Sequence, residues 1–216
     1  MNIKINEDTA LIFDLDDTLY NELSFLKSAY WDICFNLKPE QAKSLYNQVF
    51  SLYRSGKNPF LFLSKTFSIP TEHLLKKYRN HIPTIEPFPG VMDTIKMVKA
   101  NKGKLGIVTD GREITQTNKL KSLGIFQHMD YCVISESLGS EKPNPANFQK
   151  IENELKVETY YYFGDNFKKD FIAPRKMGWH TVGLIDNGMN IHSNSHNYQE
   201  NRPEYLIQSF LDINIT

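Results

Sequence analysis

The chain contains 216 residues, a length that fits one domain or one domain with a smaller insertion. Its hydrophobic content of 40% and its charged content of 23% are ordinary for a soluble globular protein. Twenty-five basic residues balance twenty-five acidic residues, so the formal net charge is +0. Without an overall field that attracts polyanions, we expect neither a nucleic-acid partner nor a membrane partner.

Cysteine usage and the N-terminal residues predict a compartment. Cys34 and Cys132 form no CxxC pair, which favours free thiols in a reducing environment over a disulfide framework. The N-terminal "MNIKINEDTA" lacks the apolar stretch of a signal peptide. No apolar run approaches the about 18 residues that a membrane span needs. We therefore expect a cytoplasmic protein.

The first predicted element is a short buried strand over residues 10–15, followed by a helical block. In residues 22–81, apolar and aromatic side chains recur at helical spacing, interrupted by the turns "KP" and "SGKNP". Pro39 in the first of these suits a first helical turn. The pattern predicts an insertion of about four helices with no strand of its own.

Strands and helices alternate after the stiff segment "EPFPG" of residues 86–90. The predicted strands are 104–109, 131–134, 160–163 and 181–185, and the predicted helices are 91–99, 113–123, 146–155 and 168–177. This alternation favours an α/β fold with a parallel sheet that is covered by helices on both faces. In such sheets, ligands bind beyond the carboxyl ends of the strands.

The stretch 186–202 is rich in Asn, Ser and His and is interpreted as a long surface loop. His192 and His196 stand four residues apart and would share a helix face as metal ligands, but solvated loop histidines explain them better because the flanking residues favour no helix. A last short strand and helix over 205–211 would close the domain.

Polar and charged residues follow the predicted strands in an ordered series. Asp14 and Asp16 end the first strand, Thr109 ends the second, Lys142 follows the third, and Asp165 and Asp170 follow the fourth. Each of these residues alone has a purely structural explanation. The DxD pair could form a turn, Thr109 could simply end a strand, Lys142 could be a surface lysine, and Asp165 could be the N-cap of a helix. Their joint occurrence predicts a site for a divalent cation and an anion.

These motifs resemble the haloacid dehalogenase (HAD) superfamily of phosphatases and related hydrolases. "DLDDT" at 14–18 is similar to the first motif of the family, DxDx[TV], and Thr109 corresponds to the second motif, since "TDGREITQTNKL" is similar to TNGxxxxQxxKL. "KPNP" at 142–145 is similar to the lysine motif, and "GDNFKKD" at 164–170 is similar to the last motif, GDxxxxD. Two positions depart from the common pattern: Asp110 and Lys169 stand where many members have Asn.

The resemblance implies a Rossmann-like core of residues 1–19 and 87–216 with a small all-α cap of residues 20–86. It also implies a Mg²⁺-dependent phosphatase with Asp14 as the nucleophile and Asp16 as the general acid and base. Asp14, the main-chain carbonyl of Asp16 and Asp165 would be the metal ligands, and Asp170 would support the metal shell. From like charge nearby, we expect Asp16 to be biased toward its acid form.

Phosphate binding is assigned by the same resemblance to Thr109, the backbone N–H of Asp110, and Lys142. The expected substrate is a small phosphorylated metabolite. Substrate choice should depend on the cap, where four residues would face the substrate or only pack between helices: Tyr20, Asn21, Trp31 and Tyr53. The sequence defines no oligomeric state.

Other functions share part of this pattern. A phosphomutase of the same superfamily has every core residue. A dehalogenase is disfavoured because halide leaves without a proton, so neither Asp16 nor a metal site would be needed. A non-enzymatic phospho-accepting module of the receiver type combines similar residues in a different order. A degenerate member would act as a binding or scaffold protein, although nothing essential is missing.

Overall fold

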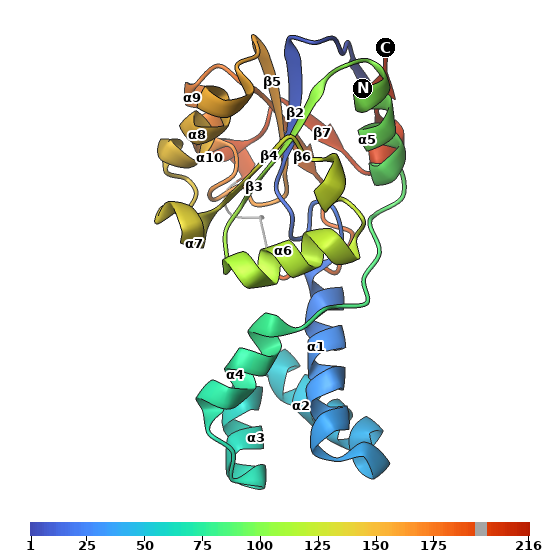
Figure 1. Cartoon of the computed structure of the whole chain (residues 1–216), viewed down its shortest axis with the longest axis vertical. Helices are drawn as coiled ribbons and strands as arrows, with labels where there is room; N and C mark the ends of the chain where they lie inside the picture. The colour runs from blue at the N-terminus through green and yellow to red at the C-terminus, as the bar shows by residue number, and fades with distance from the viewer. Residues whose placement is uncertain (193–197) are drawn as a thin grey trace.

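The computed structural model describes residues 1–192 and 198–216, and its centre is a six-stranded parallel sheet (Figure 1). The strand order is β4-β3-β2-β5-β6-β7. The strands are β2 (Thr9–Phe13), β3 (Lys104–Thr109), β4 (Tyr131–Ile134), β5 (Thr159–Gly164), β6 (His180–Leu184) and β7 (Tyr205–Ile207). Phe13 is in register with Ile107 of β3 and Phe163 of β5, so the strands that precede the predicted site end side by side.

Strand β2 is buried on both faces, which explains its uninterrupted apolar sequence. Leu11 and Phe13 point into the cluster formed with α5 (Val91–Ala100) and α6 (Glu113–Ser122). Ala10 and Ile12 point into the opposite cluster, formed with α8 (Pro145–Leu155) and α9 (Ile172–Lys176). The period of two along the strand therefore distributes its side chains between two helical layers.

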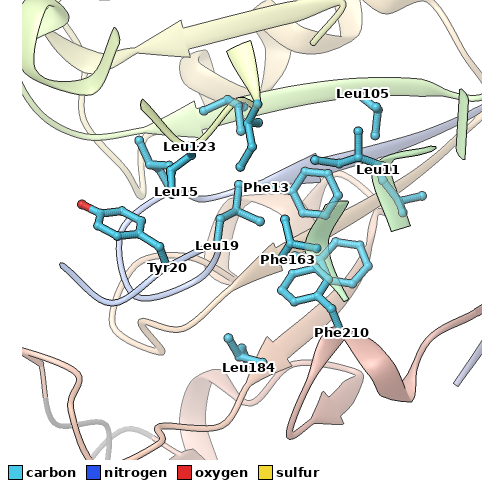
Figure 2. Packing of buried hydrophobic residues seen from close by; sticks show 14 of the residues in the cluster. Leu11, Phe13, Leu15, Leu19, Tyr20, Leu105, Leu123, Phe163, Leu184 and Phe210 are labelled. Carbon is cyan, nitrogen blue, oxygen red and sulfur yellow. The ribbon is translucent and has the colours of Figure 1, made fainter. Parts of the chain in front are cut away.

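Aromatic rings lie directly behind the ends of β2 and β5. The ring centroids of Phe13 and Phe163 are 5.0 Å apart, and Phe210 lies 6.0 Å and 5.8 Å from them (Figure 2). Tyr20 lies at the edge of this cluster with its hydroxyl pointing out of it (Figure 2). The packed rings give the strand ends a rigid, water-excluding support.

Four helices project from the carboxyl edge of the sheet as a separate layer (Figure 1). They are α1 (Glu22–Leu37), α2 (Ala42–Arg54), α3 (Pro59–Phe67) and α4 (Thr71–Asn80), with a short 3₁₀ helix at Pro39–Gln41. They enclose an apolar cluster of their own around Tyr30, Val49 and Leu63. The Asn58 side chain accepts hydrogen bonds from the N–H groups of Phe60 and Leu61, so "NP" starts α3 as a capped helix with Pro at its first position.

The segment that returns from α4 to the sheet reaches α5 through a tight turn at Gly90. This residue has φ +87°, and a Cβ there would lie 2.8 Å from the backbone of Phe210 and Leu211. Only glycine fits both conditions. The "PG" at the end of "EPFPG" therefore fixes where the chain re-enters the α/β layer.

The α/β class, the parallel sheet and its helical layers are confirmed, and the strands 104–109 and 131–134 match residue for residue. Five predictions at the element level were wrong or incomplete. Strand β2 ends at Phe13 rather than at residue 15, α9 is shorter than 168–177, and residues 198–201 of the predicted loop form α10 (Tyr198–Asn201). Also missed were α7 (Ser135–Leu138) and a two-stranded parallel sheet of β1 (Asn2–Ile3) and β8 (Asn214–Ile215).

Two further sequence expectations concern thiols and membranes. Cys34 and Cys132 are both free thiols. Among the described residues, none of the helices has the length and apolar character needed to cross a bilayer.

Truncation of Leu11 tests the dependence of the fold on β2. Leu11 is fully buried, so Leu11→Ala should lower the free energy of unfolding by about 2–5 kcal/mol through lost burial and a residual cavity. Urea denaturation measures this. The matched control, Leu211→Ala, removes a side chain that is 68% exposed and should change stability by less than about 0.5 kcal/mol. Equal effects of the two substitutions would contradict the assignment of β2 as the core strand.

Candidate active site

The site lies where the parallel strands end. Asp14 directly follows β2, Thr109 is the last residue of β3, and Asp165 follows β5. Lys142 comes from the loop between α7 and α8, next to a cis Lys142–Pro143 peptide bond. Parallel pairing places these segments at one edge of the sheet, as expected for open α/β sheets.

Lys142 is the central cation of the site. Its side chain is fully buried, and its Nζ lies 2.7 Å from Asp14 Oδ1 and 2.7 Å from Asp170 Oδ1. It also donates to the hydroxyl of Tyr162 at 3.0 Å. Burial opposes the charge of the ammonium, but Asp14 and Asp170 hold the pKa of Lys142 well above its usual range.

Three buried carboxylates form a cluster at this point, and two of them, Asp14 and Asp170, contact the lysine. One oxygen from each of Asp14, Asp165 and Asp170 lies within 4.8 Å of the others. Burial raises the pKa of Asp14 to about 7, although Lys142 opposes the shift. Burial, followed by the charges of Asp170 and Asp14, raises the pKa of Asp165 well above its usual range. The cluster therefore has more carboxylates than its one buried ammonium can balance, which is the donor set that a hard cation prefers.

Asp170 is held by the turn that follows β5. Its Oδ2 accepts a hydrogen bond from the backbone N–H of Asn166 at 2.8 Å. A Cβ on Gly164 would lie 2.6 Å from Asp170 Oδ2, so the glycine of "GD" provides the space that this carboxylate occupies. The spacing of GDxxxxD thus follows from the close approach of the turn to its own strand end.

Asp16 lies in a different charge environment from Asp14. Its two carboxylate oxygens are 2.7 and 2.9 Å from Nζ of Lys119, Oδ2 accepts from Gln116 Nε2 at 2.9 Å, and Oδ1 accepts from the hydroxyl of Tyr20. Despite burial, Lys119 and these donors lower the pKa of Asp16. The expectation that like charge biases Asp16 toward its acid form is therefore wrong for this structure, because a buried ammonium contacts it.

Thr109 and Asp110 extend the site along the end of β3. The Thr109 hydroxyl is buried and accepts from Gln116 Nε2 at 2.7 Å. The Asp110 carboxylate accepts from the backbone N–H of Lys142 at 3.0 Å and pairs with Nζ of Lys169 at 2.7 Å. The two residues that depart from the family pattern, Asp110 and Lys169, thus form an ion pair with each other.

The loop that follows β6 also reaches the site, which sequence reasoning missed. Asn190 Nδ2 donates to Asp165 Oδ2 at 3.0 Å, and the N–H of Ile191 donates to Asp17 Oδ2 at 2.8 Å. Nothing in the composition of 186–202 distinguishes these contacts from a solvated loop. Of the two histidines considered there, His192 is exposed, and His196 lies outside the described residues.

Gln116 and Lys119 were also missed as site residues, although the quoted pattern TNGxxxxQxxKL contains both. They lie on the buried face of α6 together with Thr115 and Leu120. Polar residues at the spacing of an inner helical face were the available signal.

The four candidates for substrate contact separate into two groups. Tyr20 and Asn21 lie beside the site: Tyr20 contacts Asp16, and the amide of Asn21 exchanges hydrogen bonds with that of Asn187 at 3.2 and 3.1 Å. Trp31 is 45% exposed and packs against Tyr46 within the helical layer. The Tyr53 ring packs against Tyr30.

Comparison with known proteins identifies related sequences and folds. The family model for haloacid dehalogenase-like hydrolases matches residues 11–184. A glyceraldehyde 3-phosphate phosphatase from Methanocaldococcus jannaschii is 31% identical over 197 residues, covering 81% of this chain and 84% of the relative. The pyrophosphatase PpaX from Halalkalibacterium halodurans is 26% identical, covering 96% and 95%. The HAD-hydrolase YfnB from Bacillus subtilis, solved with bound magnesium, shares the fold with a TM-score of 0.66, 20% identity and 97% coverage of both chains.

A double-mutant cycle tests the Asp110–Lys169 pair. Asp110→Asn and Lys169→Asn each leave one charge without its partner, whereas the double variant carries two neutral amides. We expect a coupling of about 1 kcal/mol in the free energy of unfolding, because the pair is partly buried. Urea denaturation of the four proteins measures it. Additive effects would mean that the two side chains do not interact.

Glu22 gives the structure a pH dependence. Burial raises its pKa to about 8 from the ordinary 4.5, so the folded chain holds a proton that the unfolded chain releases, and stability falls as pH rises between those values. Glu22→Gln should therefore have a Tm close to that of the wild type at pH 5 and above it at pH 9. Glu72→Gln, at an exposed position on α4, should show a constant difference. A constant difference for Glu22→Gln as well would contradict the shift.

Proposed function

We propose that this chain, an enzyme of the haloacid dehalogenase-like hydrolase family, is a Mg²⁺-dependent phosphatase that cleaves a small phosphomonoester through a phosphoaspartyl intermediate on Asp14. The observation that carries the proposal is the joint position of Asp14, Lys142, Asp165 and Asp170 at the carboxyl edge of the sheet. The Asp14 carboxylate contacts the ammonium of Lys142 and lies close to the carboxylates of Asp165 and Asp170.

The donor set supports magnesium as the cofactor. Asp14, the main-chain carbonyl of Asp16 and Asp165 would hold the ion, and Asp170 would maintain the shell through Lys142 and the N–H of Asn166. Two like unit charges about 4 Å apart repel by about 4 kcal/mol at an effective dielectric constant of about 20. Bound Mg²⁺ would supply the positive charge that lets an anionic carboxylate approach an anionic phosphate.

The bond-making, proton-transfer and phosphate-binding roles belong to residues of the protein. An oxygen of Asp14 forms a bond to phosphorus while the bond to the leaving oxygen breaks, and Asp16 gives that oxygen a proton. Asp16 then removes a proton from the water that hydrolyses the phosphoaspartate. The Thr109 hydroxyl, the Asp110 N–H and the Lys142 ammonium hold the phosphoryl oxygens.

Residues 20–86 serve as a cap over a catalytic core of residues 1–19 and 87–216. The leaving group of the substrate lies between them, next to Tyr20 and Asn21. The names of the relatives, which refer to glyceraldehyde 3-phosphate and pyrophosphate, support a small phosphorylated substrate.

Replacement of the nucleophile tests this function. With Mg²⁺, the wild type should release phosphate from p-nitrophenyl phosphate and from members of a phosphometabolite panel. Asp14→Asn should lower kcat by at least about 10³-fold, because no acyl-phosphate can form. EDTA should remove the wild-type activity, and added Mg²⁺ should restore it. Transfer of the phosphoryl group to a second substrate hydroxyl instead of water would identify a phosphomutase.

The matched control is Asp93→Asn, at an exposed position on α5, which should retain wild-type activity. If Asp14→Asn and Asp93→Asn were equally active, or if phosphate release did not depend on a divalent cation, the proposal would be wrong.

A further inference from the structure

The loop that follows β6, residues 186–191, contacts the cluster of carboxylates from outside the four sequence motifs. Asn190 Nδ2 donates a hydrogen bond to Asp165 Oδ2 at 3.0 Å, and Asn190 is half-buried. Asp165 is 2% exposed and forms the cluster together with Asp14 and Asp170. An uncharged donor from a separate segment of the chain thus contacts one of the three carboxylates.

The backbone on both sides of the Asn190 side chain is held by carboxylates. The N–H of Asn190 donates to Asp186 Oδ1 at 3.2 Å, which closes a turn within the loop. The N–H of Ile191 donates to Asp17 Oδ2 at 2.8 Å, and Asp17 is 2% exposed. Because the backbone is already fixed, Asn190 loses little further conformational entropy when its amide binds Asp165.

The loop is also attached to the start of the helical cap. The side-chain amides of Asn187 and Asn21 exchange hydrogen bonds at 3.1 and 3.2 Å, and Asn21 directly precedes α1. Asp17, which holds the loop with one oxygen, accepts at the other oxygen from the N–H of Glu22, the first residue of α1. The position of the loop therefore does not depend on the contact with Asp165 alone.

Asp165 needs an orienting contact because of its neighbours. One oxygen of Asp165 lies within 4.8 Å of oxygens of Asp14 and Asp170, and ionised carboxylates at that separation repel one another. Repulsion favours rotation of the Asp165 carboxylate away from the other two, whereas an N–H donor on Oδ2 restricts that rotation. Carboxylates that bind metal ions are themselves commonly held by such hydrogen bonds.

We propose that Asn190 is a positioning residue that holds the carboxylate of Asp165 in the orientation that binds Mg²⁺. This inference rests on the proposed function, which assigns Asp165 as a ligand of the ion. Mg²⁺ demands nearly ideal octahedral geometry, whereas Ca²⁺ accepts a flexible arrangement of oxygen ligands. A carboxylate that is free to rotate should therefore cost the site more affinity for Mg²⁺ than for Ca²⁺.

Calorimetric titration of the full chain with each ion, without substrate, tests this role. Asn190→Leu keeps the approximate size of the side chain and removes the N–H donor. Its Kd for Mg²⁺ should rise at least about tenfold, because removal of a hydrogen bond to a metal ligand typically costs about 10–100-fold in affinity. Its Kd for Ca²⁺ should rise less. Asn190→Ala should show the same pattern, since the donor and not the volume is responsible, and it provides the test if Asn190→Leu does not fold.

The matched control is Met189→Ala, which truncates the preceding residue of the same loop. Met189 is 47% exposed, so this variant should bind both ions with the Kd values of the wild type. A loss of Mg²⁺ affinity in Met189→Ala equal to that in Asn190→Leu would assign the effect to the loop as a whole and overturn the role of Asn190.

Wild-type Kd values for Mg²⁺ in the two Asn190 variants would overturn this inference and leave the proposed function intact. Equal losses for Mg²⁺ and Ca²⁺ would also overturn it, because they would show a general loss of order instead of a loss of geometry. A wild type that binds no Mg²⁺ would overturn the cofactor of the proposed function, and this inference with it. The two failures are therefore distinguishable in one set of titrations.

Discussion

The ion contacts of Lys142 with Asp14 and Asp170 are the interaction on which the rest of the site depends. They compensate for most of the hydration that the buried ammonium loses, and they bring together segments that follow two strands from distant parts of the chain. The third carboxylate, Asp165, exceeds what one lysine can balance, and burial raises the pKa values of Asp14 and Asp165. An imbalance of this kind is costly for stability but well suited to binding a divalent cation.

This cluster of charged side chains has to be held in place by rigidly packed strands. Strand β2 provides this support because its alternate residues are packed on both faces, and the Phe13, Phe163 and Phe210 rings fill the space behind the strand ends. The same packing excludes water and strengthens every charge interaction at the sheet edge. Core packing and site chemistry are therefore consequences of the same few strands.

The sequence predicts the parts of this structure that depend on local pattern. Strands 104–109 and 131–134 and the acidic residues that follow β2 and β5 could be identified because apolar runs and motif spacing are local properties. The β1–β8 pair joins the two ends of the chain, and α7 is a single turn, so neither has a periodic signal. The contacts of Lys119 with Asp16 and of Asn190 with Asp165 arise only from the tertiary fold. The role of each predicted site residue stays a prediction until it is measured.

Asp14 and Asp16 are separated by one residue, yet they belong to different charge networks, and the backbone explains how. The extended conformation of β2 stops at Phe13, and Asp17 adopts a left-handed conformation with φ 56°, so the chain turns within the motif. Leu15 and Leu19 remain in the core through this turn. Because of this turn, Asp14 forms an ion pair with Lys142 and Asp16 forms one with Lys119, and the two lysines come from different segments. A single strand end can thus present two carboxylates with opposite pKa shifts, because burial raises the pKa of Asp14 while Lys119 lowers that of Asp16.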